Sequence, residues 1–447
     1  MVCQRTIRIK RKYVTIISVT AVITYLLLSY VSFAKKSDSL QPHHNQQDDT
    51  KNKEIINRYI SYTGDYKTML LKEKLQRLER KFNKTRSIIT NSKPMLKPNY
   101  NVHVFYYAWY KNPETDGIYA HWNHKYLDNW KKEDTHVYPT GTHQPPNDIG
   151  SNYYPLLGCY SSTDPDIIDK HVRYIKESGI GVIVLSWTPP NFTDTPTEML
   201  PVLFETALKH NVKISLHIEP YAGRNPINML QYLKEFLKIY GNHPALYKIK
   251  KPMGYKILPV IYIYDSYLIP VAAWKEIFGY KGNLSVRGTE LDAIFIGLLV
   301  ELQHKSHIKK SGFDGFYTYF ATNSFTYGST WKNWPVLSKF AAQNGLIFIP
   351  SVGPGYIDTK VRAWNSANTR QRAHGQYYDV AWRSALNNNA NYVSITSFNE
   401  WHEGTQIEPA ISKSVKGYTY LDYQPEGPYY YLNLTRMWVE QFEKSTN

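Results

Sequence analysis

The run IGVIVLSW occupies residues 180–187 and is almost entirely apolar. A continuous apolar run of this length is typical of a parallel strand that is buried on both faces. Seven further runs share this character, at residues 102–108, 212–218, 257–265, 292–299, 313–319, 346–351 and 391–398. Helical patterns lie between several of them, for example over 165–178 and 197–210. Eight strands that alternate with helices predict an α/β fold, a (β/α)8 TIM-type barrel over residues 98–447.

A doubly wound open sheet is the alternative that the same alternation leaves open. That fold would carry a glycine-rich phosphate loop after its first strand, and no such loop follows residue 108. The later Gly353-Pro-Gly355 matches no dinucleotide fingerprint. We therefore favour the barrel and expect no nucleotide cofactor.

The amino-terminal segment predicts a membrane anchor. Tyr13 to Ala34 is uncharged and rich in Val, Ile and Leu, and its 22 residues can span a bilayer as a helix. Five cations precede this run and only two follow it, which places the amino terminus in the cytoplasm and the rest in a lumen. A cleaved signal peptide is less favoured, because the run is long and no A-x-A site closes it. We expect a cytoplasmic tail (1–12), a transmembrane signal anchor (13–34) and a lumenal stem (35–97).

The charge of the chain is concentrated outside the predicted barrel. The formal net charge is +16, of which residues 1–97 hold +13, so that only +3 remains for residues 98–447. A domain with so little net charge lacks the basic surface that phosphate backbones require. The composition therefore excludes nucleic acid as the partner.

Two further features fit a lumenal domain without proving it. Cys3 and Cys159 lie on opposite sides of the predicted anchor, so they cannot form an intramolecular disulfide. Acceptor sequences for N-glycosylation occur at Asn83, Asn191, Asn283 and Asn433.

Polar and aromatic residues gather where the predicted strands end, which is where a TIM-type barrel forms its active site. Aromatic rings stack on the apolar faces of sugars, and Asp, Glu, Asn and His hydrogen-bond to hydroxyls. A long irregular segment, 109–163, follows the first strand and predicts a functional loop. The candidate substrate-binding residues at the strand ends and in this segment are Tyr107, Trp109, His121, Trp122, Trp187, His217, Glu219, Tyr264, Asp265, Tyr319 and Asn399.

The stretch SFNEWHEGTQIE (residues 397–408) holds the candidate catalytic residues. Glu400 and Glu403 are three positions apart and would fall on one face of a helical turn, just past the eighth strand. Two neighbouring carboxyl groups are the usual device for hydrolysing a glycosidic bond, with one proton donor and one base or nucleophile. Trp401 and nearby rings would desolvate a carboxyl and raise its pKa. These residues predict a glycoside hydrolase.

Other functions are disfavoured by the residues present. A zincin helix that begins at His402 would need a histidine at position 406, where Gln406 stands. A glycosyltransferase would need a D-x-D metal site, and Asp164-Pro-Asp166 is better explained as a helix start capped by Asp164. A catalytically silent glycan-binding module would have lost Glu400 or Glu403. We expect neither a metal nor a cofactor.

Several long motifs resemble those of glycoside hydrolase family 99. The resemblance runs from about residue 98 to the carboxyl terminus. It rests on YYAWY (106–110), DGIYAHWNH (116–124), VLSW (184–187), YIYDSYL (262–268), GFDGFYTYFATN (312–323), FIPSVGPGYIDT (348–359) and ITSFNEWHEGTQIEPA (395–410).

The resemblance implies an endo-α-1,2-mannosidase that acts on N-linked high-mannose glycans from a Golgi membrane, as a single-pass type II protein with a lumenal catalytic domain. It implies a reaction that retains the anomeric configuration and passes through a 1,2-anhydro sugar. In this reaction Glu400 would assist the 2-hydroxyl of the substrate, and Glu403 would be the acid for the leaving oxygen and then the base for water. Tyr356, within the motif at 348–359, joins the expected substrate-binding residues. One departure concerns Thr188, where the family carries an aromatic residue after Trp187; this bears on glycan preference and not on the reaction.

We expect a chain that lacks residues 1–36, expressed behind a secretion signal, to be soluble and to keep its glycosidase activity. The apolar run would serve only as an anchor and contribute nothing to the barrel core. Specific activity and thermal unfolding of the secreted protein check this. A truncated chain that misfolds would contradict the assignment of 13–34 as an anchor alone.

Overall fold

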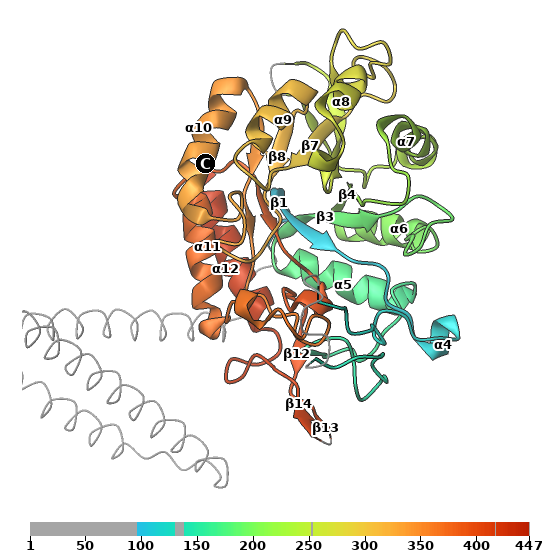
Figure 1. Ribbon diagram of the computed structural model, residues 1–447, viewed down its shortest axis with the longest axis vertical. Coiled ribbons are helices and arrows are strands. Elements are labelled where there is room, and N and C mark those ends of the chain that lie inside the picture. The colour runs from blue at the N-terminus through green and yellow to red at the C-terminus, as the bar shows by residue number, and fades with distance from the viewer. Residues whose placement is uncertain (1–95, 130–137, 252–253, 416, 447) are drawn as a thin grey trace, which may run out of the picture. The chain divides into compact units, whose positions relative to one another are not determined.

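The computed structural model describes residues 96–129, 138–251, 254–415 and 417–446 (Figure 1). Within these ranges no helix is long and apolar enough to cross a membrane. The predicted tail, anchor and nearly all of the stem lie outside the described residues. Element labels follow Figure 1.

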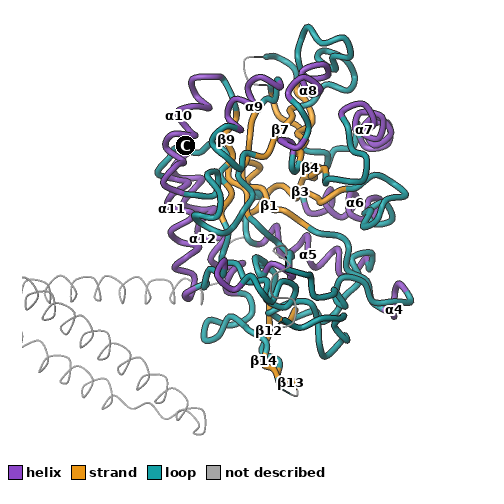
Figure 2. The backbone as a smooth tube through the Cα atoms, viewed as in Figure 1, coloured by secondary structure: helices purple, strands orange, loops and turns teal. Residues whose placement is uncertain are grey.

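A ring of parallel strands forms the centre of the described domain, with the helices outside it (Figures 1 and 2). The strands follow one another around the ring almost in chain order, each paired in parallel with its neighbour. They are β1 (Asn99–Tyr106), β3 (Ile180–Trp187), β4 (Lys213–Ile218), β6 (Ile257–Ile263), β7 (Ile294–Leu298), β8 (Gly315–Tyr317), β9 (Ile347–Ile349), β10 (Ser351–Val352) and β11 (Val393–Ile395).

The run at 346–351 completes the ring. Its first part, β9, pairs with β8, and its second part, β10, pairs with β11. Only Pro350 separates the two parts, so the chain itself joins the ends of the sheet. Counted as one strand, β9 and β10 give the eight strands that the sequence predicts. The barrel is confirmed, and the open doubly wound sheet is wrong.

The helices cover the outside of the ring, and most of them lie between two strands in the sequence. The longer ones are α5 (Pro165–Glu177), α6 (Leu200–His210), α7 (Pro226–Tyr240), α8 (Val271–Phe278), α9 (His304–Ser311), α10 (Trp334–Asn344), α11 (Gln376–Leu386) and α12 (Tyr430–Thr446). The remaining elements are short: α4 (Pro113–Asp116), β2 (Tyr154–Pro155), β5 (Lys248–Lys250), β12 (Ala410–Ile411), β13 (Ser414–Val415) and β14 (Tyr418–Thr419).

Helix α5 illustrates how the sequence sets these elements. The Asp164 carboxylate accepts the Asp166 backbone N–H at 2.9 Å, and Pro165 occupies the first turn, where its missing N–H costs nothing. Ile168, Val172 and Ile175 are fully buried at helical spacing. The expected helix cap at Asp164 is therefore confirmed.

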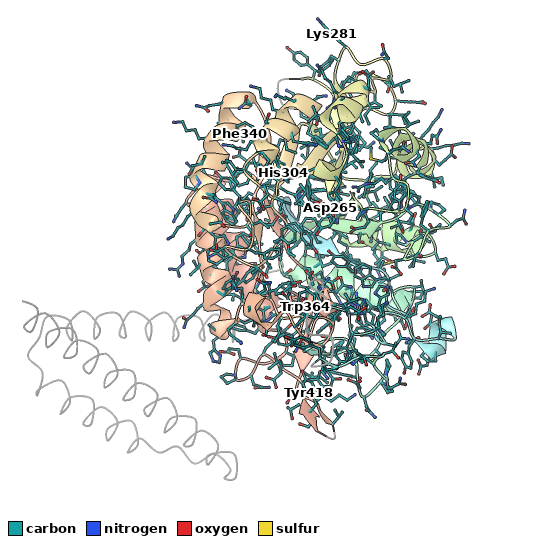
Figure 3. All side chains as sticks on the ribbon, viewed as in Figure 1. Asp265, Lys281, His304, Phe340, Trp364 and Tyr418 are labelled. Carbon is teal, nitrogen blue, oxygen red and sulfur yellow. The ribbon has the colours of Figure 1, made fainter. Side chains whose placement is uncertain are left out.

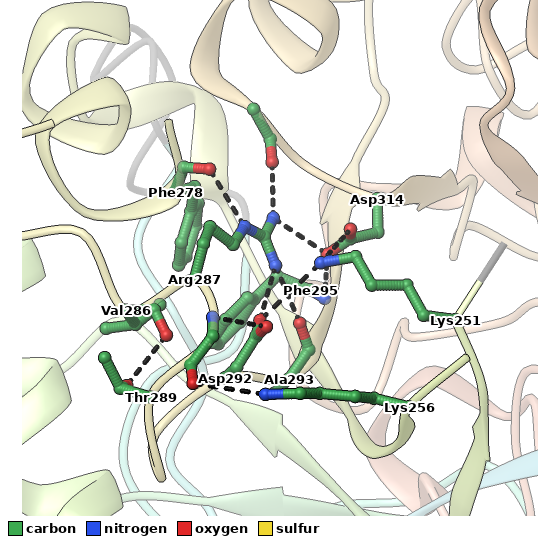
Figure 4. A network of polar contacts seen from close by, with 12 residues as sticks. Lys251, Lys256, Phe278, Val286, Arg287, Thr289, Asp292, Ala293, Phe295 and Asp314 are labelled. Carbon is green, nitrogen blue, oxygen red and sulfur yellow. Dashed lines mark hydrogen bonds and ion pairs between the residues drawn. The ribbon is translucent and has the colours of Figure 1, made fainter. Parts of the chain in front are cut away.

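A buried ion cluster holds the amino ends of β7 and β8 (Figure 4). The Arg287 guanidinium, with its side chain only 2% exposed, lies 3.1 Å from an Asp292 oxygen and 2.9 Å from an Asp314 oxygen. It also donates to the carbonyls of Phe278, Ala293 and Gly312. Lys251 adds a second cation, 3.6 Å from Asp292 and 3.4 Å from Asp314. The Arg287 side chain thus links α8, the residues that enter β7 and β8, and the loop between α8 and β7.

We expect Arg287→Met to lower the free energy of unfolding by about 3 kcal/mol, because it leaves Asp292 and Asp314 buried with only Lys251 as a cation. Urea denaturation of the purified protein measures this change. Lys281→Met, at an exposed position of the same loop, is the control and should leave the midpoint unchanged. Equal midpoints for the two variants would show that the cluster does not stabilise the barrel.

Candidate active site

The two candidate catalytic glutamates lie on one short turn, which we call the glutamate turn (residues 397–404). After β11 the chain forms a 3₁₀ helix over Trp401–Glu403, with Glu400 at the position that precedes it. The charge of Glu403 contributes to the raised pKa of Glu400, so the two carboxyl groups lie near each other. Gly404 ends the turn with a φ of 60°, and a Cβ there would lie 2.7 Å from Ile357.

Hydrogen bonds between side chains and the backbone fasten the glutamate turn to the end of β1. The Asn399 amide donates to the Tyr107 carbonyl and accepts the Tyr107 N–H, both at 2.8 Å. The Tyr110 hydroxyl donates to the Asn399 carbonyl at 3.0 Å and accepts the Trp401 N–H at 3.1 Å. Asn399 is completely buried, and its side chain positions the turn through these bonds.

The environment of the pair perturbs both carboxyl groups. Burial raises the pKa of Glu400 well above its ordinary value; the charge of Glu403 adds to this rise and Arg362 opposes it. Burial also raises the pKa of Glu403 to about 7, although the positive charge of Arg362 lowers it. Glu400 is 4% exposed and its Oε2 has no hydrogen-bond partner. A carboxyl with a pKa near 7 can both donate and accept a proton near neutrality.

Arg362 is the cation of the site. Its Nη1 lies 3.9 Å from Glu403 Oε1 and 3.1 Å from Asp358 Oδ2. The same Asp358 oxygen accepts hydrogen bonds from the Tyr356 hydroxyl at 2.8 Å and from the Asn365 amide at 2.9 Å. The predicted residue Tyr356 therefore lies beside Glu403, whose charge adds to the effect of burial in raising the pKa of this phenol.

A group of aromatic side chains from four strand ends lines the same region. The Tyr319 ring lies 5.0 Å from the Tyr264 ring and 5.8 Å from the His217 ring, and its hydroxyl is bonded to that of Tyr107. Burial raises the pKa values of Tyr107, Tyr264 and Tyr319, and the charges of nearby glutamates raise them further. These phenols stay protonated and can donate hydrogen bonds.

The ends of β4 and β6 add two carboxyl groups to this region. Glu219 accepts the Ser186 hydroxyl at 2.9 Å and lies 3.1 Å from His217 Nδ1. Its charge contributes to the raised pKa values of Glu400 and Glu403, which places it near them. Burial raises the pKa of Asp265, a residue with a left-handed φ of 47°.

Described residues of the long segment 109–163 contact the glutamate turn. The Trp109 ring stacks on the His121 ring at 4.6 Å with an interplanar angle of 2°. The ring nitrogens of His121 lie 3.3 Å from His402 Nε2 and 2.9 Å from Asp194 Oδ1. Gly150 supplies a carbonyl 2.7 Å from His402 Nδ1.

Two predicted substrate-binding residues lie in the core instead. Trp122 is 1% exposed, and its indole N–H donates to the Tyr160 carbonyl at 2.8 Å. Trp187 is 2% exposed, and its ring packs 6.2 Å from the Phe236 ring. The neighbouring Thr188 donates its hydroxyl to the Thr193 carbonyl at 3.1 Å, within its own loop.

Other residues of the candidate site escaped the sequence analysis. No spacing between Arg362 or Asp358 and the two glutamates indicates a catalytic role. Arg362 is distant from Glu403 in the sequence and lies beside it only because the chain is folded. Glu408 is fully buried and accepts a hydrogen bond from the Trp401 indole at 3.0 Å. The sequence signal that could have identified Glu408 was its position five residues after Glu403. Within the described ranges, no cluster of His, Cys, Asp and Glu could hold a metal ion.

A closed barrel with a paired, partly desolvated carboxyl site at the carboxyl ends of its strands defines a glycoside hydrolase. Comparison with known proteins agrees: the model of glycosyl hydrolase family 99 matches residues 97–444. The chain belongs to this family.

Relatives and solved structures are similar over the same part of the chain. Rat glycoprotein endo-alpha-1,2-mannosidase is 51% identical over 350 residues, which is 77% of this chain and 76% of the rat protein. The human glycoprotein endo-alpha-1,2-mannosidase-like protein is 48% identical over 348 residues, covering 77% and 76% of the two chains. The structure of the GH99 endo-alpha-mannosidase from Bacteroides thetaiotaomicron has a TM-score of 0.73 at 42% identity, covering 78% of this chain and 99% of the bacterial one.

We expect Arg362→Met to move the alkaline limb of the kcat/KM–pH profile upward by about one pH unit. Removing a cation near a carboxyl raises its pKa, and a carboxyl that acts in its protonated form loses activity as the pH rises through that pKa. Arg362→Lys keeps the charge and is the control. A limb that stays in place or moves to lower pH in the Met variant would contradict this electrostatic role.

Proposed function

We propose that this chain is a retaining endo-α-1,2-mannosidase of N-glycan processing. It cleaves the α-1,2 bond between a glucosylated mannose and the next mannose of an immature high-mannose glycan, and it releases glucosyl-mannose. The pairing of Glu400 and Glu403 beside Arg362 at the barrel mouth carries this proposal. The names of the rat and bacterial relatives supply the sugar and the linkage.

The reaction uses the 2-hydroxyl of the substrate as its nucleophile. Glu400 takes the hydroxyl proton while the oxygen attacks C1, and Glu403 gives its proton to the departing glycosidic oxygen. A 1,2-anhydro sugar results. Glu403 then takes a proton from water, which attacks C1, while Glu400 returns a proton to the 2-oxygen as the three-membered ring opens. Two inversions at C1 give net retention.

The proton must lie on Glu403 when substrate is bound. In the free site Glu400 is the more strongly desolvated carboxyl, so burial favours a proton there. The Oε2 of Glu400 has no protein partner, and a substrate hydroxyl that donates to it stabilises the ionised form. Substrate binding therefore moves the shared proton towards Glu403, which lies closer to Arg362 but is ready to donate at a pKa of about 7.

The glycan-binding surface is formed by strand-end side chains around the pair. Tyr107, Tyr264 and Tyr319 offer rings and phenol donors, and Glu219 and Asp265 offer acceptors. The residue after Trp187 is a threonine, shorter than the aromatic residue found at this place in the family, and its hydroxyl is bonded within its loop. The site is thus poorer by one stacking surface, which bears on the preference for glucosylated glycans and not on the chemistry.

The catalytic domain acts in the Golgi lumen, held by a single-pass type II anchor. The apolar run at 13–34 and the excess of cations before it support this location. Golgi glycoproteins present immature N-glycans to such a domain.

The test is incubation of the purified enzyme with glucosylated high-mannose glycans, followed by detection of glucosyl-mannose and of the anomer first formed. We expect Glu400→Gln and Glu403→Gln each to lose several orders of magnitude in kcat while substrate binding persists, because the amide keeps the shape and removes the titrating group.

Glu290→Gln, at an exposed position, is the matched control and should keep full turnover. Near-normal turnover in either folded variant of the pair would remove that residue from its role. A wild-type protein that binds these glycans without cleaving them would instead be a glycan-binding module.

A further inference from the structure

A group of large apolar side chains is exposed on one surface of the barrel, and we call it the basal patch. Its members are Tyr255 (96% exposed), Tyr280 (77%), Ile257 (68%) and Leu284 (54%). The first two are the most exposed large apolar side chains in the described part of the chain. They come from two segments: the turn before β6 together with the first residue of that strand, and the loop between α8 and β7.

The two segments lie against each other, which brings the members of the patch to one region of the surface. The Lys251 ammonium lies 5.5 Å from the centre of the Tyr280 ring, which joins the turn to the loop. The Lys256 ammonium donates to the Gly288 carbonyl at 3.2 Å and joins them a second time. Exposed large apolar side chains that gather in one region of a folded domain can mark a place that another group covers.

The basal patch lies away from the catalytic site. Both segments precede strands, so they belong to the amino face of the barrel, opposite the carboxyl ends where Glu400 and Glu403 lie. Figure 3 shows Lys281, within the loop, at an edge of the domain and well away from Asp265 at a strand end. The glycan substrate therefore does not account for this patch.

An acceptor sequence for N-glycosylation lies within the patch. Asn283-Leu284-Ser285 includes the patch residue Leu284, and the Asn283 side chain is exposed. The three residues form a turn rather than a helix: the Ser285 N–H donates to the Gly282 carbonyl at 3.2 Å, and the Asn283 N–H donates to a Glu276 carboxylate oxygen at 3.1 Å. Such a turn leaves the asparagine side chain open to a modifying enzyme.

The other two acceptor sequences in the described ranges are placed differently. Asn433 lies inside α12, and its partner Thr435 is completely buried with its hydroxyl bonded to the Tyr431 carbonyl at 2.7 Å. Asn191 lies in the loop after β3, on the catalytic face. Asn283 alone of the three lies in a turn on the face opposite the catalytic site.

We propose that Asn283 carries an N-linked glycan and that this glycan covers the basal patch. The amide nitrogen of Asn283 bonds to C1 of the first sugar of a polyprenyl-diphosphate-linked oligosaccharide. The bond from C1 to the diphosphate oxygen breaks, the diphosphate leaves, and the nitrogen loses one proton to solvent. The apolar faces of the first sugars then lie over Tyr255 and Tyr280. The inference rests on the proposed lumenal location and is independent of the proposed reaction.

The first experiment expresses the full chain in animal cells and analyses the peptide that contains residue 283, before and after enzymatic removal of N-glycans. We expect a glycopeptide in which the asparagine at this position is converted to an aspartate when the glycan is removed. Asn283→Gln and Ser285→Ala should each lose one glycan, and Ser285→Thr, which keeps the acceptor sequence, should retain it. All variants should keep the kcat/KM of the wild type, because the patch lies opposite the cleft.

Protease treatment of sealed microsomes separates the two ways in which this can fail. A barrel domain that is protected, with Asn283 unmodified, overturns the inference and leaves the lumenal location intact. A barrel domain that is digested overturns both. The glycosidase assay on the purified enzyme tests the proposed reaction independently of either outcome.

The second experiment tests whether the glycan covers the patch. Enzymatic removal of the glycan should increase the binding of a hydrophobic fluorescent dye to the wild type. The same treatment of a Tyr255→Ser, Tyr280→Ser double variant should produce little increase, because the apolar surface has been removed. An equal increase in both proteins, or none in the wild type, would show that the glycan does not lie on the patch.

Discussion

The buried carboxylate of Glu408 holds the candidate active site together. It has no exposed surface, and it accepts hydrogen bonds from the Tyr160 hydroxyl at 2.8 Å, the Trp401 indole at 3.0 Å and His171 Nε2 at 3.1 Å. If His171 donates from Nε2 to Glu408, its Nδ1 can accept the Tyr106 hydroxyl at 2.9 Å. Both ring nitrogens of His171 then have a hydrogen-bond partner. One carboxylate thus joins α5, β1, the long segment 109–163 and the glutamate turn.

Trp401 lies between Glu400 and Glu403, the two candidate catalytic glutamates, and this position gives the network its importance. With the indole held by Glu408 and the backbone N–H held by Tyr110, the intervening residue cannot rotate, so the two carboxyl groups keep their mutual orientation. Arg372 holds the residues that follow, since its Nη2 donates to the carbonyls of Gly404 and Gln406. Three tyrosine rings surround this guanidinium, the nearest at 4.4 Å. The turn is rigid because buried charges on both sides hold its backbone and the indole of Trp401.

The barrel could be predicted from the sequence because parallel strands buried on both faces leave a continuous apolar run. All eight predicted runs correspond to strands, and the run at 346–351 is divided only where Pro350, which has no N–H, interrupts the ladder. The proximity of Glu400 and Glu403 could be predicted because their spacing is local. His171 and Glu408 meet from 237 positions apart, which no local pattern reveals. Sequence also does not say on which side of the backbone a side chain lies. Trp122 and Asn399, expected at the barrel mouth, are therefore found in the core, where their polar groups bind the backbone.

Two buried charged residues, Arg287 at the amino end of the barrel and Glu400 at its carboxyl end, differ in how completely their polar atoms are bonded. At the amino end, Arg287 meets Asp292 and Asp314 with its donors satisfied, which favours a single stable arrangement. At the carboxyl end, Glu400 is almost as deeply buried, yet one of its oxygens has no partner and the nearest cation contacts its neighbour instead. Leaving a buried polar group without a partner costs about 1–3 kcal/mol. The folded state tolerates this cost because many other hydrogen bonds hold the glutamate turn. The unpartnered Oε2 of Glu400 is free to accept a hydrogen bond from a substrate hydroxyl.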